Sequence, residues 1–583
     1  MHNSKPGLIG VLSSIFKHVS IKSKIRLLFI IFLSIFSALS EVLTLGSIIP
    51  FLSILLDVNA AQNNSLVQSL LLFIKYFGLN NENVAINVSI LFITFVIIST
   101  ILRILLVILY THWTYALGIE IASLLYYKSI TQPYHTYSKQ NSSNILGLIS
   151  TKLETFTGEV FVSIPQLIAG IIIGLAITGS ILLITPKIAL ITFLIFGVSY
   201  LFIQLIYNKT VFHNSYKIAS LQNSIIKLIQ ESLGSIKNII LDKTQNFNHN
   251  FFYDNIKKLR MAQFENAYIS QYPKFLLEGI AILLITILAI YWSINHGNTV
   301  EFIPELAVLA LGGQKLLPIF QLIYHAFNRL ITNREALKET AEVLARPSVL
   351  QINDTSKLEF KNSLEIKNLK FKYESSETIF ENLNLEILPR SVTGIFGKSG
   401  IGKTTLFEVM MMLLNPDEGK IIVDNVEIEK SNIDNWQSII AHVPQNVFIY
   451  DDTIRNNIVN YNMGGVLDEA KYNDVIIQSE LGEFIDSLPN GDSTVVGERG
   501  AKISGGQKQR IGIARALYKD AQIFFFDEIT SSLDQETEKN IINSIKKINQ
   551  LGKTIFMISH KLSVLNICDS IYEFENKKIT KIK

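Results

Sequence analysis

The segment with the clearest chemistry is Gly397–Thr404, which reads GKSGIGKT. It follows an apolar stretch at 392–396 and precedes a helical pattern from Thr405, the context that a G-x-x-x-x-G-K-[ST] pattern requires. The glycines let backbone N–H groups approach phosphate oxygens, and the helix N-terminus adds partial positive charge. We expect Lys403 to reach the β/γ-phosphates and the Thr404 hydroxyl to bind Mg²⁺. The segment therefore predicts a nucleotide phosphate site rather than a chance glycine turn.

A second apolar stretch, 523–526, ends in two carboxylates, Asp527 and Glu528. A strand of this kind lies beside the phosphate loop in proteins that hydrolyse nucleoside triphosphates. There, Asp527 would hold Mg²⁺ through water and Glu528 would polarise the attacking water. Taken alone, the pattern fits a strand that ends at a solvated turn equally well. The phosphate loop upstream favours the catalytic interpretation.

The segment between these two motifs, Ile503–Gln507, reads ISGGQ and resembles the L-S-G-G-Q signature of the ABC ATPases. The other motifs of that family are also present, in the family's order. They are Tyr373, matching the aromatic residue that stacks on adenine; Gln445 of the Q-loop; 531–534 (SSLD) of the D-loop; and His560, the switch histidine.

The resemblance implies ATP and Mg²⁺ as cofactors and assigns roles residue by residue. The expected catalytic residues are Glu528, His560 and Gln445. The expected metal-binding residues are Thr404, Gln445 and Asp527. The residues expected to contact the nucleotide are Tyr373, Gly397, Ser399, Gly400, Gly402, Lys403, Thr404, Thr405, Ser504, Gly505, Gly506, Gln507 and Asp534.

Three residues depart from the usual family motifs: Ile503 replaces Leu, Ser532 replaces Ala and Lys561 replaces Arg. None of the three changes removes a phosphate contact, so we expect an active ATPase. In this family two chains form the functional unit, and ATP binds between the phosphate loop of one chain and the signature segment of the other. The resemblance therefore implies a homodimer with two complete sites.

The composition shows what surrounds these motifs. The 583 residues are 49% hydrophobic and only 17% charged, against about 25% charged in an average soluble domain. Lys and Arg number 52 and Asp and Glu 49, a balance that argues against nucleic acid as a partner. The single cysteine, Cys568, excludes a disulfide framework and a cysteine-based zinc site. These features predict a membrane protein with a soluble part.

The apolar runs lie in the first half and predict six membrane spans, because about 20 apolar helical residues cross a bilayer. The predicted spans are 27–56, 84–117, 160–184, 188–207, 275–295 and 303–327. The expected fold is an all-α six-helix transmembrane domain (1–345), a linker (346–362) and an α/β P-loop ABC ATPase domain (363–583). Short strands alternate with helices after Leu364, as in α/β domains.

Lysine and arginine in the flanking segments predict the orientation. The N-terminus, the helical segments 118–159 and 208–270 and the ATPase domain are expected in the cytoplasm, at a bacterial inner membrane. The family's coupling helices are expected near Tyr134–Asn141 and Gln222–Gln230. The apolar segment Ser65–Phe77, expected outside, is too short to span and would either re-enter the bilayer or lie on its outer leaflet.

Six spans followed by one ATPase domain resemble a half-transporter of the ABC exporter type. The cargo is best indicated by charges within the spans, which are costly and usually functional. Three such cations, from three different spans, are Arg103, Lys274 and Lys315. If they line one cavity, their positive charge would suit a diphosphate as the cargo. The alternative is that they pair with Glu41, Glu278 and Glu305 or reach the interface.

The membrane half also resembles the bacterial lipid-linked oligosaccharide flippases of protein N-glycosylation. The shared features are Glu41 and then 47–51 (SIIPF) in span one, the outer segment 65–77, Arg103 within span two, 273–279 (PKFLLEG) in span five and 315–318 (KLLP) in span six. In that family, the three basic positions handle the pyrophosphate and the outer helix contacts the polyprenyl tail. The resemblance implies a lipid-linked glycan as the cargo.

Other functions are weighed against this one. An exporter of another lipid, a drug or a peptide shares every ATPase motif, and an ABC-type channel or regulator is also compatible, although the intact Glu528 favours turnover. A soluble, DNA-associated ABC ATPase is excluded by the six apolar runs.

Overall fold

The computed structural model describes residues 7–56, 67–68, 84–184, 186–296, 303–347, 358–373, 377–459, 467–531 and 533–583. Its internal contacts divide the chain into two units. The helical unit comprises Met1–Gln132 and Ser138–Val349, and the α/β unit comprises Pro133–Tyr137 and Leu350–Lys583.

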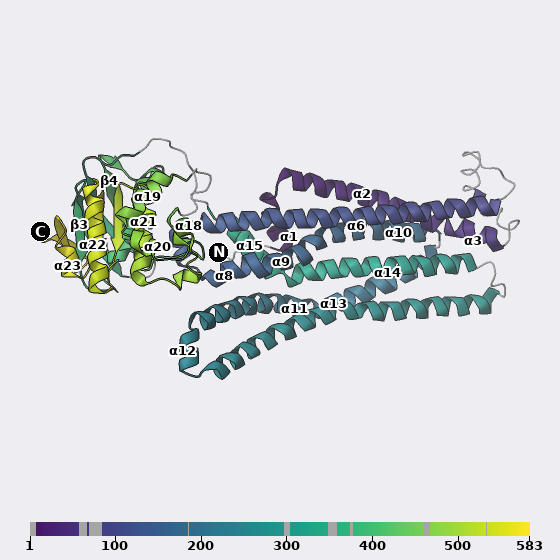
Figure 1. Ribbon diagram of the computed structural model, residues 1–583. Helices are drawn as coiled ribbons and strands as arrows, with labels where there is room; N and C mark the ends of the chain where they lie inside the picture. Colours follow the sequence, from purple (N-terminus) through teal and green to yellow (C-terminus); the bar gives the residue numbers. More distant parts are fainter. Residues whose placement is uncertain are drawn as a thin grey trace. The chain divides into compact units, whose positions relative to one another are not determined.

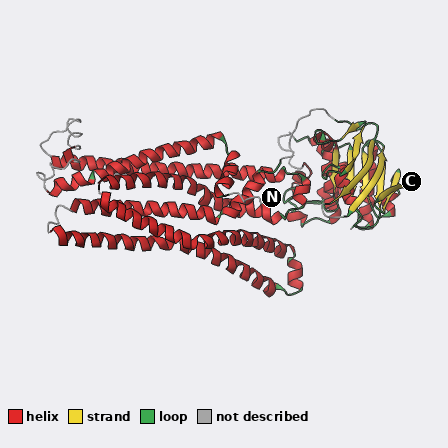
Figure 2. Cartoon of the chain, turned by 180° about the vertical axis from the view of Figure 1, so that it is seen from behind, coloured by secondary structure: helices red, strands yellow, loops and turns green. Residues whose placement is uncertain are grey.

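The helical unit consists of long helices that run side by side in both views (Figures 1 and 2). Its longer helices are α1 (Leu8–Lys17), α2 (Ile21–Gly46), α3 (Ile48–Leu56), α6 (Val84–Ile130), α10 (Val162–Ile184), α11 (Pro186–Gly234), α13 (Gln245–His296), α14 (Ile303–Thr332) and α15 (Arg334–Leu344). Shorter segments connect them: α8 (Ser142–Gly147), η2 (Leu148–Lys152), α9 (Leu153–Thr155), η3 (Phe156–Phe161) and α12 (Ile236–Leu241).

Several of these helices are long and apolar enough to cross a membrane. Among the described residues, four stretches qualify: Ile21–Leu55, Val84–Ile130, Ser142–Leu183 and Gln245–Tyr291. They contain all of predicted span two, all but the last residue of spans one and three, and 275–291 of span five. The predicted spans at 188–207 and 303–327 fall on α11 and α14 and stay predictions.

The first predicted span is interrupted. Helix α2 ends with Ser47 as its C-cap, and α3 begins at Ile48. Pro50 occupies the third position of α3, where a helix needs no backbone N–H donor. Hydropathy alone cannot detect this break, because every residue from 42 to 56 is uncharged.

Close helix contacts hold the helical unit together. A Cβ on Gly170 of α10 would lie 2.9 Å from Cγ1 of Ile323 on α14, so only glycine permits this approach. Trp113 of α6 is buried, and its indole N–H donates to the carbonyl of Ser23 on α2 over 2.8 Å. Leu117 and Ile121 continue the same buried face of α6 at helical spacing.

The described residues of the α/β unit form two sheets and the helices around them (Figure 2). The strands are β1 (Leu364–Lys372), β2 (Thr378–Ile387), β3 (Val392–Phe396), β4 (Glu418–Val423), β5 (Val426–Glu427), β6 (Ile440–Val443), β7 (Ile523–Asp527), β8 (Thr554–Ile558), β9 (Ser570–Glu575) and β10 (Lys578–Lys581). The helices are α7 (Tyr134–Ser138, mostly in this unit), α16 (Lys403–Met410), α17 (Ile433–Ile439), α18 (Ile454–Val459), α19 (Glu469–Gln478), α20 (Gly482–Asp486), α21 (Gly505–Tyr518), α22 (Gln535–Gln550) and α23 (Leu562–Leu565), with short turns η5 (Gly491–Ser493) and η6 (Glu498–Gly500).

The six-stranded sheet positions the sequence motifs. Its order is β10-β9-β3-β8-β7-β6, and β3, β8, β7 and β6 pair in parallel. Strands β7 and β8 are buried along their whole length, as their continuous apolar sequences predict. Because the carboxyl ends of parallel strands meet at one edge, the segments that follow these strands share that edge. The smaller antiparallel sheet has the order β2-β1-β4-β5.

Some sequence predictions lie outside the described residues. They include the outer segment 65–77 except 67–68, most of the linker at 348–357 and Ser532 of the D-loop. Helix α14 contains Glu305, but its side chain is not among those described.

Candidate functional site

The phosphate loop connects β3 to α16. Gly402, the N-cap of α16, has φ +112°, and a Cβ there would lie 2.2 Å from Cγ2 of Ile379. Only glycine fits both the conformation and the space. The Lys403 ammonium donates to the carbonyls of Gly397 (2.8 Å) and Lys398 (2.9 Å). It therefore lies over the loop whose N–H groups would hold phosphates.

Burial lowers the pKa of Lys403, and the Glu528 and Asp527 carboxylates oppose this shift. Burial raises the pKa of Asp527, which accepts a hydrogen bond from Thr404. Both side chains are thus partly shielded from water. A bound triphosphate would stabilise the charged form of Lys403, and a bound cation would stabilise that of Asp527. The Thr404 hydroxyl and the Asp527 carboxylate offer the oxygen ligands that Mg²⁺ prefers. The donors therefore fit an Mg²⁺–ATP complex.

The Glu528 carboxylate lies between residues from two other strand ends. Nε2 of His560, after β8, is 3.0 Å from Oε1 of Glu528. Nε2 of Gln445, after β6, donates to Oε2 of Glu528 over 3.3 Å and to the Ser531 hydroxyl over 3.1 Å. Glu528 has φ +48°, an unusual conformation for a non-glycine residue. The three predicted catalytic residues therefore lie together.

The signature segment begins helix α21. Ser504 caps this helix: its backbone N–H donates to Oε1 of Gln507 over 2.7 Å, and its hydroxyl accepts from the Gln507 N–H over 3.3 Å. A Cβ on Gly506 would lie 2.2 Å from Cγ2 of Thr537, so the helix packs closely against α22. This capped N-terminus presents the N–H groups that bind anions.

Two further predicted residues lie near other segments of the site. The Tyr373 hydroxyl is 3.3 Å from the hydroxyl of Thr405, and its ring packs edge-on against Phe371. Asp534 accepts hydrogen bonds from Thr537, which lower its pKa. Tyr373 thus lies beside helix α16, which follows the phosphate loop, and its ring packs against Phe371.

Sequence reasoning missed two residues of this unit. Nε2 of Gln509 donates to the carbonyl of Gln445 over 2.6 Å and ties α21 to the Q-loop. No local sequence pattern predicts this contact, because the two residues are 64 positions apart. Glu408 of α16 accepts a hydrogen bond over 3.0 Å from the hydroxyl of Tyr134, which belongs to the predicted coupling segment. Burial raises the pKa of Glu408 and that of Tyr134, the latter to about 12.

Comparisons with known proteins agree with this geometry. Residues 380–531 match the sequence profile of the ABC transporter family. The chain is similar to an ATP-dependent lipid A-core flippase of Saccharophagus degradans, 28% identical over 464 residues that cover 78% of this chain and 76% of the relative. It is also similar to a mitochondrial iron-sulfur clusters transporter of Kluyveromyces lactis, 36% identical over 217 residues that cover 36% of this chain and 29% of the relative.

A bacterial Atm1-family ABC exporter with ATP bound has the same fold, with a TM-score of 0.76 and 18% identity. That likeness covers 96% of this chain and 94% of the exporter, so it includes the helical unit. The chain has an ABC transporter domain and the fold of an ABC exporter-type half-transporter. Its C-terminal domain is an ATPase whose hydrolysis of ATP is coupled to transport. The half-transporter is a membrane protein.

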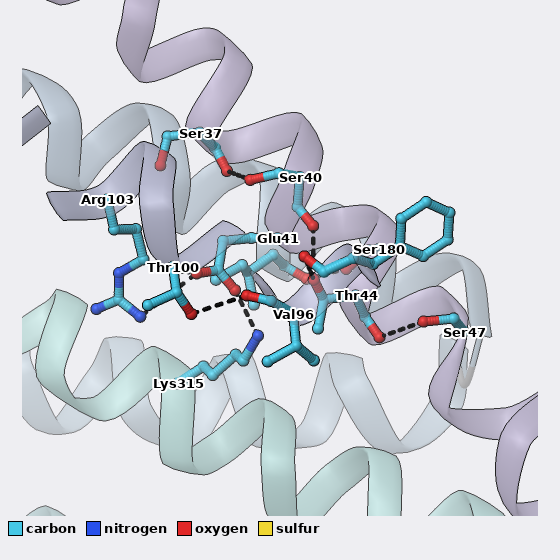
Figure 3. A network of polar contacts seen from close by, with 12 residues as sticks. Ser37, Ser40, Glu41, Thr44, Ser47, Val96, Thr100, Arg103, Ser180 and Lys315 are labelled. Atoms are coloured by element: carbon cyan, nitrogen blue, oxygen red, sulfur yellow. Dashed lines mark hydrogen bonds and ion pairs between the residues drawn. The ribbon is translucent and has the colours of Figure 1, made fainter. Parts of the chain in front are cut away.

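The helical unit of the half-transporter contains the three predicted cargo cations. Two of them meet at one carboxylate: Nζ of Lys315 on α14 is 2.5 Å from Oε2 of Glu41 on α2, and a guanidinium nitrogen of Arg103 on α6 is 3.4 Å from Oε1 (Figure 3). Among the described contacts, Lys274 pairs instead with Glu278 on its own helix, over 3.9 Å. All three cations thus have carboxylate partners, as the pairing alternative predicts, and their convergence on one cargo cavity stays a prediction.

Proposed function

We propose that this half-transporter works as a homodimer that flips a polyprenyl-diphosphate-linked oligosaccharide, or a similar lipid, across the bacterial inner membrane. The observation that carries the proposal is the meeting of Arg103 and Lys315, from two apolar helices, at Glu41. Cations inside a membrane domain are costly and usually line a substrate path. Lys274 is retained as a third contact for the headgroup.

The similarity to a lipid A-core flippase supports a lipid as the cargo class. We further propose that each nucleotide site uses Mg²⁺, held by Thr404, Gln445 and Asp527, and that ATP lies between Lys403 of one chain and the partner's signature segment. The Lys/Arg-rich flanks support a cytoplasmic ATPase domain. The bound metal would neutralise charge on the β- and γ-phosphates, while Glu528 holds the attacking water.

The test is a flipping assay in liposomes that contain a polyprenyl-diphosphate-linked glycan, with ATP hydrolysis measured in parallel. Arg103→Ala and Lys315→Ala should reduce flipping about tenfold or more, because each removes one charge contact with the diphosphate. Basal ATP hydrolysis should persist, since the nucleotide site is in the other domain. Arg260→Ala, which removes an exposed arginine of α13, is the matched control.

Unchanged flipping in well-folded Arg103→Ala, Lys274→Ala and Lys315→Ala would contradict the cargo assignment. Flipping of the same glycan on an uncharged polyprenyl carrier at an equal rate would contradict it as well. Either result would leave a half-transporter for another lipid, a drug or a peptide.

A further inference from the structure

A buried carboxylate lies behind the two cations of the helical unit. The Glu41 side chain is only 2% exposed, whereas that of Lys315 is 26% and that of Arg103 is 56% exposed. Each carboxylate oxygen has its own cation, Oε1 facing Arg103 and Oε2 facing Lys315. Figure 3 shows the two cations reaching Glu41 from two different helices. The two cations are thus the accessible part of this cluster, and the carboxylate is its buried part.

Among the side chains that the structure describes, the neighbouring polar groups supply no other charge. The hydroxyls of Ser40 and Thr44 on α2 donate to the carbonyls of Ser37 and Ser40, both within the helix (Figure 3). Helix α10, which packs against α2, carries no ionisable residue in its sequence, and its Ser180 hydroxyl donates to the carbonyl of Ile177 within the helix. Within the described residues, Glu41 is therefore the anion that balances Arg103 and Lys315.

An exposed arginine on an apolar helix would be costly against lipid, so Arg103 must face water or protein. An anionic headgroup that enters from that side meets cations that are already paired. To bind Arg103 and Lys315, the headgroup must break their ion pairs with Glu41, and these pairs can form again when the headgroup leaves. The two anions compete for the same partners because neither cation reaches another carboxylate among the described contacts.

We propose that Glu41 is an internal anion that exchanges with the headgroup: it holds Arg103 and Lys315 in the unloaded transporter and displaces the headgroup from them on release. This inference rests on the proposed function, because it takes the anionic lipid as the cargo. It adds a residue whose role is to weaken binding. A site with two unopposed cations would bind a diphosphate tightly and release it slowly.

The test compares wild type and Glu41→Gln in phosphatidylcholine liposomes doped with a polyprenyl diphosphate, a polyprenyl monophosphate or the uncharged polyprenol. Lipid-stimulated ATP hydrolysis gives KM and kcat for each lipid. For Glu41→Gln, the KM for the diphosphate should fall by about tenfold or more, and kcat should fall with it, because a competing charge has been removed. Glu41→Asp, which keeps the carboxylate, should restore values near those of wild type.

Glu342→Gln is the matched control, since this glutamate pairs with Lys338 on an exposed helix face and should leave both constants unchanged. A KM for Glu41→Gln that is unchanged or raised, in folded protein, overturns the exchange role while the wild-type response to the diphosphate keeps the proposed function intact. A wild type that responds equally to the diphosphate and the uncharged polyprenol overturns the proposed function and this inference with it.

If Glu41→Gln does not fold, a second pair of variants tests whether Glu41 competes with the headgroup for the cations. Lys315→Gln leaves Arg103 paired with Glu41, and Lys315→Gln/Glu41→Gln removes one charge of each sign. If Glu41 competes with the headgroup, the double variant has a lower KM for the diphosphate than Lys315→Gln. An equal or higher KM in the double variant means that Glu41 only holds the helices together, and overturns the proposal.

Discussion

The imidazole of His560 and the carboxylate of Glu528 face each other across the ends of two parallel strands, with Nε2 of His560 3.0 Å from Oε1 of Glu528. Gln445 approaches the other carboxylate oxygen, at 3.3 Å. The carboxylate is therefore held in place from both sides. A general base that is fixed in this way can orient a water toward the γ-phosphate without losing rotamer freedom in each turnover.

Glu528→Gln keeps the size of this side chain and removes its basicity. We expect ATP binding to persist and hydrolysis to fall by about 10²–10⁴-fold, the usual effect of losing a general base. Phosphate release from purified protein measures the effect, and Glu483→Gln, at an exposed glutamate of α20, is the control. Near wild-type hydrolysis would exclude Glu528 as the base.

The shared site predicts complementation between two inactive chains. Lys403→Ala removes the phosphate-loop cation, and Ser504→Arg places a bulky side chain at the helix N-terminus of the signature segment. Each homodimer should be inactive because both of its sites carry the defect. A mixed dimer should regain one intact site, measurable as ATP hydrolysis in dimers purified with two different tags. Absence of any recovery in verified mixed dimers would contradict the shared-site arrangement or show that both sites must work together.

Much of the nucleotide site could be predicted because each motif depends on a few contiguous residues. A phosphate loop needs a strand, three glycines and a helix start, and all of them are visible between 392 and 405. The capping box at Ser504 is likewise a short-range pattern. The bond between Gln509 and the Q-loop joins residues 64 positions apart, and no local pattern reports it.

In the membrane half, fewer side-chain contacts could be predicted from the sequence. Hydropathy gives the depth of Glu41 and Lys315, but these residues are 274 positions apart and their contact depends on how α2 and α14 are rotated about their axes. That rotation is set by packing against neighbouring helices, including the glycine contacts of α10. The sequence could therefore offer pairing and convergence only as alternatives.

The helical unit contains an ion pair with a buried lysine, and the loss of this pair should reduce stability. The Lys152 side chain is 1% exposed and pairs with Glu339 of α15, which is 37% exposed. Glu339→Gln leaves a buried ammonium without its partner, and we expect a loss of roughly 2–4 kcal/mol in the free energy of unfolding. The thermal midpoint in detergent measures it.

A control for this experiment lies one helical turn further along α15. Glu342 pairs with Lys338 over 3.8 Å on an exposed face, so Glu342→Gln should cost less than about 1 kcal/mol. The apolar double variant Lys152→Met/Glu339→Leu should recover most of the stability, because no unpaired buried charge remains. Equal midpoints for Glu339→Gln and Glu342→Gln would show that the Lys152 contact does not stabilise the fold.

The final prediction concerns how the three cargo cations act together. Arg103 and Lys315 share Glu41, so removing one changes the partner of the other, whereas Lys274 pairs within its own helix. In a double-mutant cycle on flipping rates, Arg103→Ala and Lys315→Ala should be non-additive by about 0.5–3 kcal/mol. Lys274→Ala should combine with either of them additively, within about 0.3–0.5 kcal/mol. Additivity of all three pairs would show that Glu41 does not couple Arg103 to Lys315 during transport.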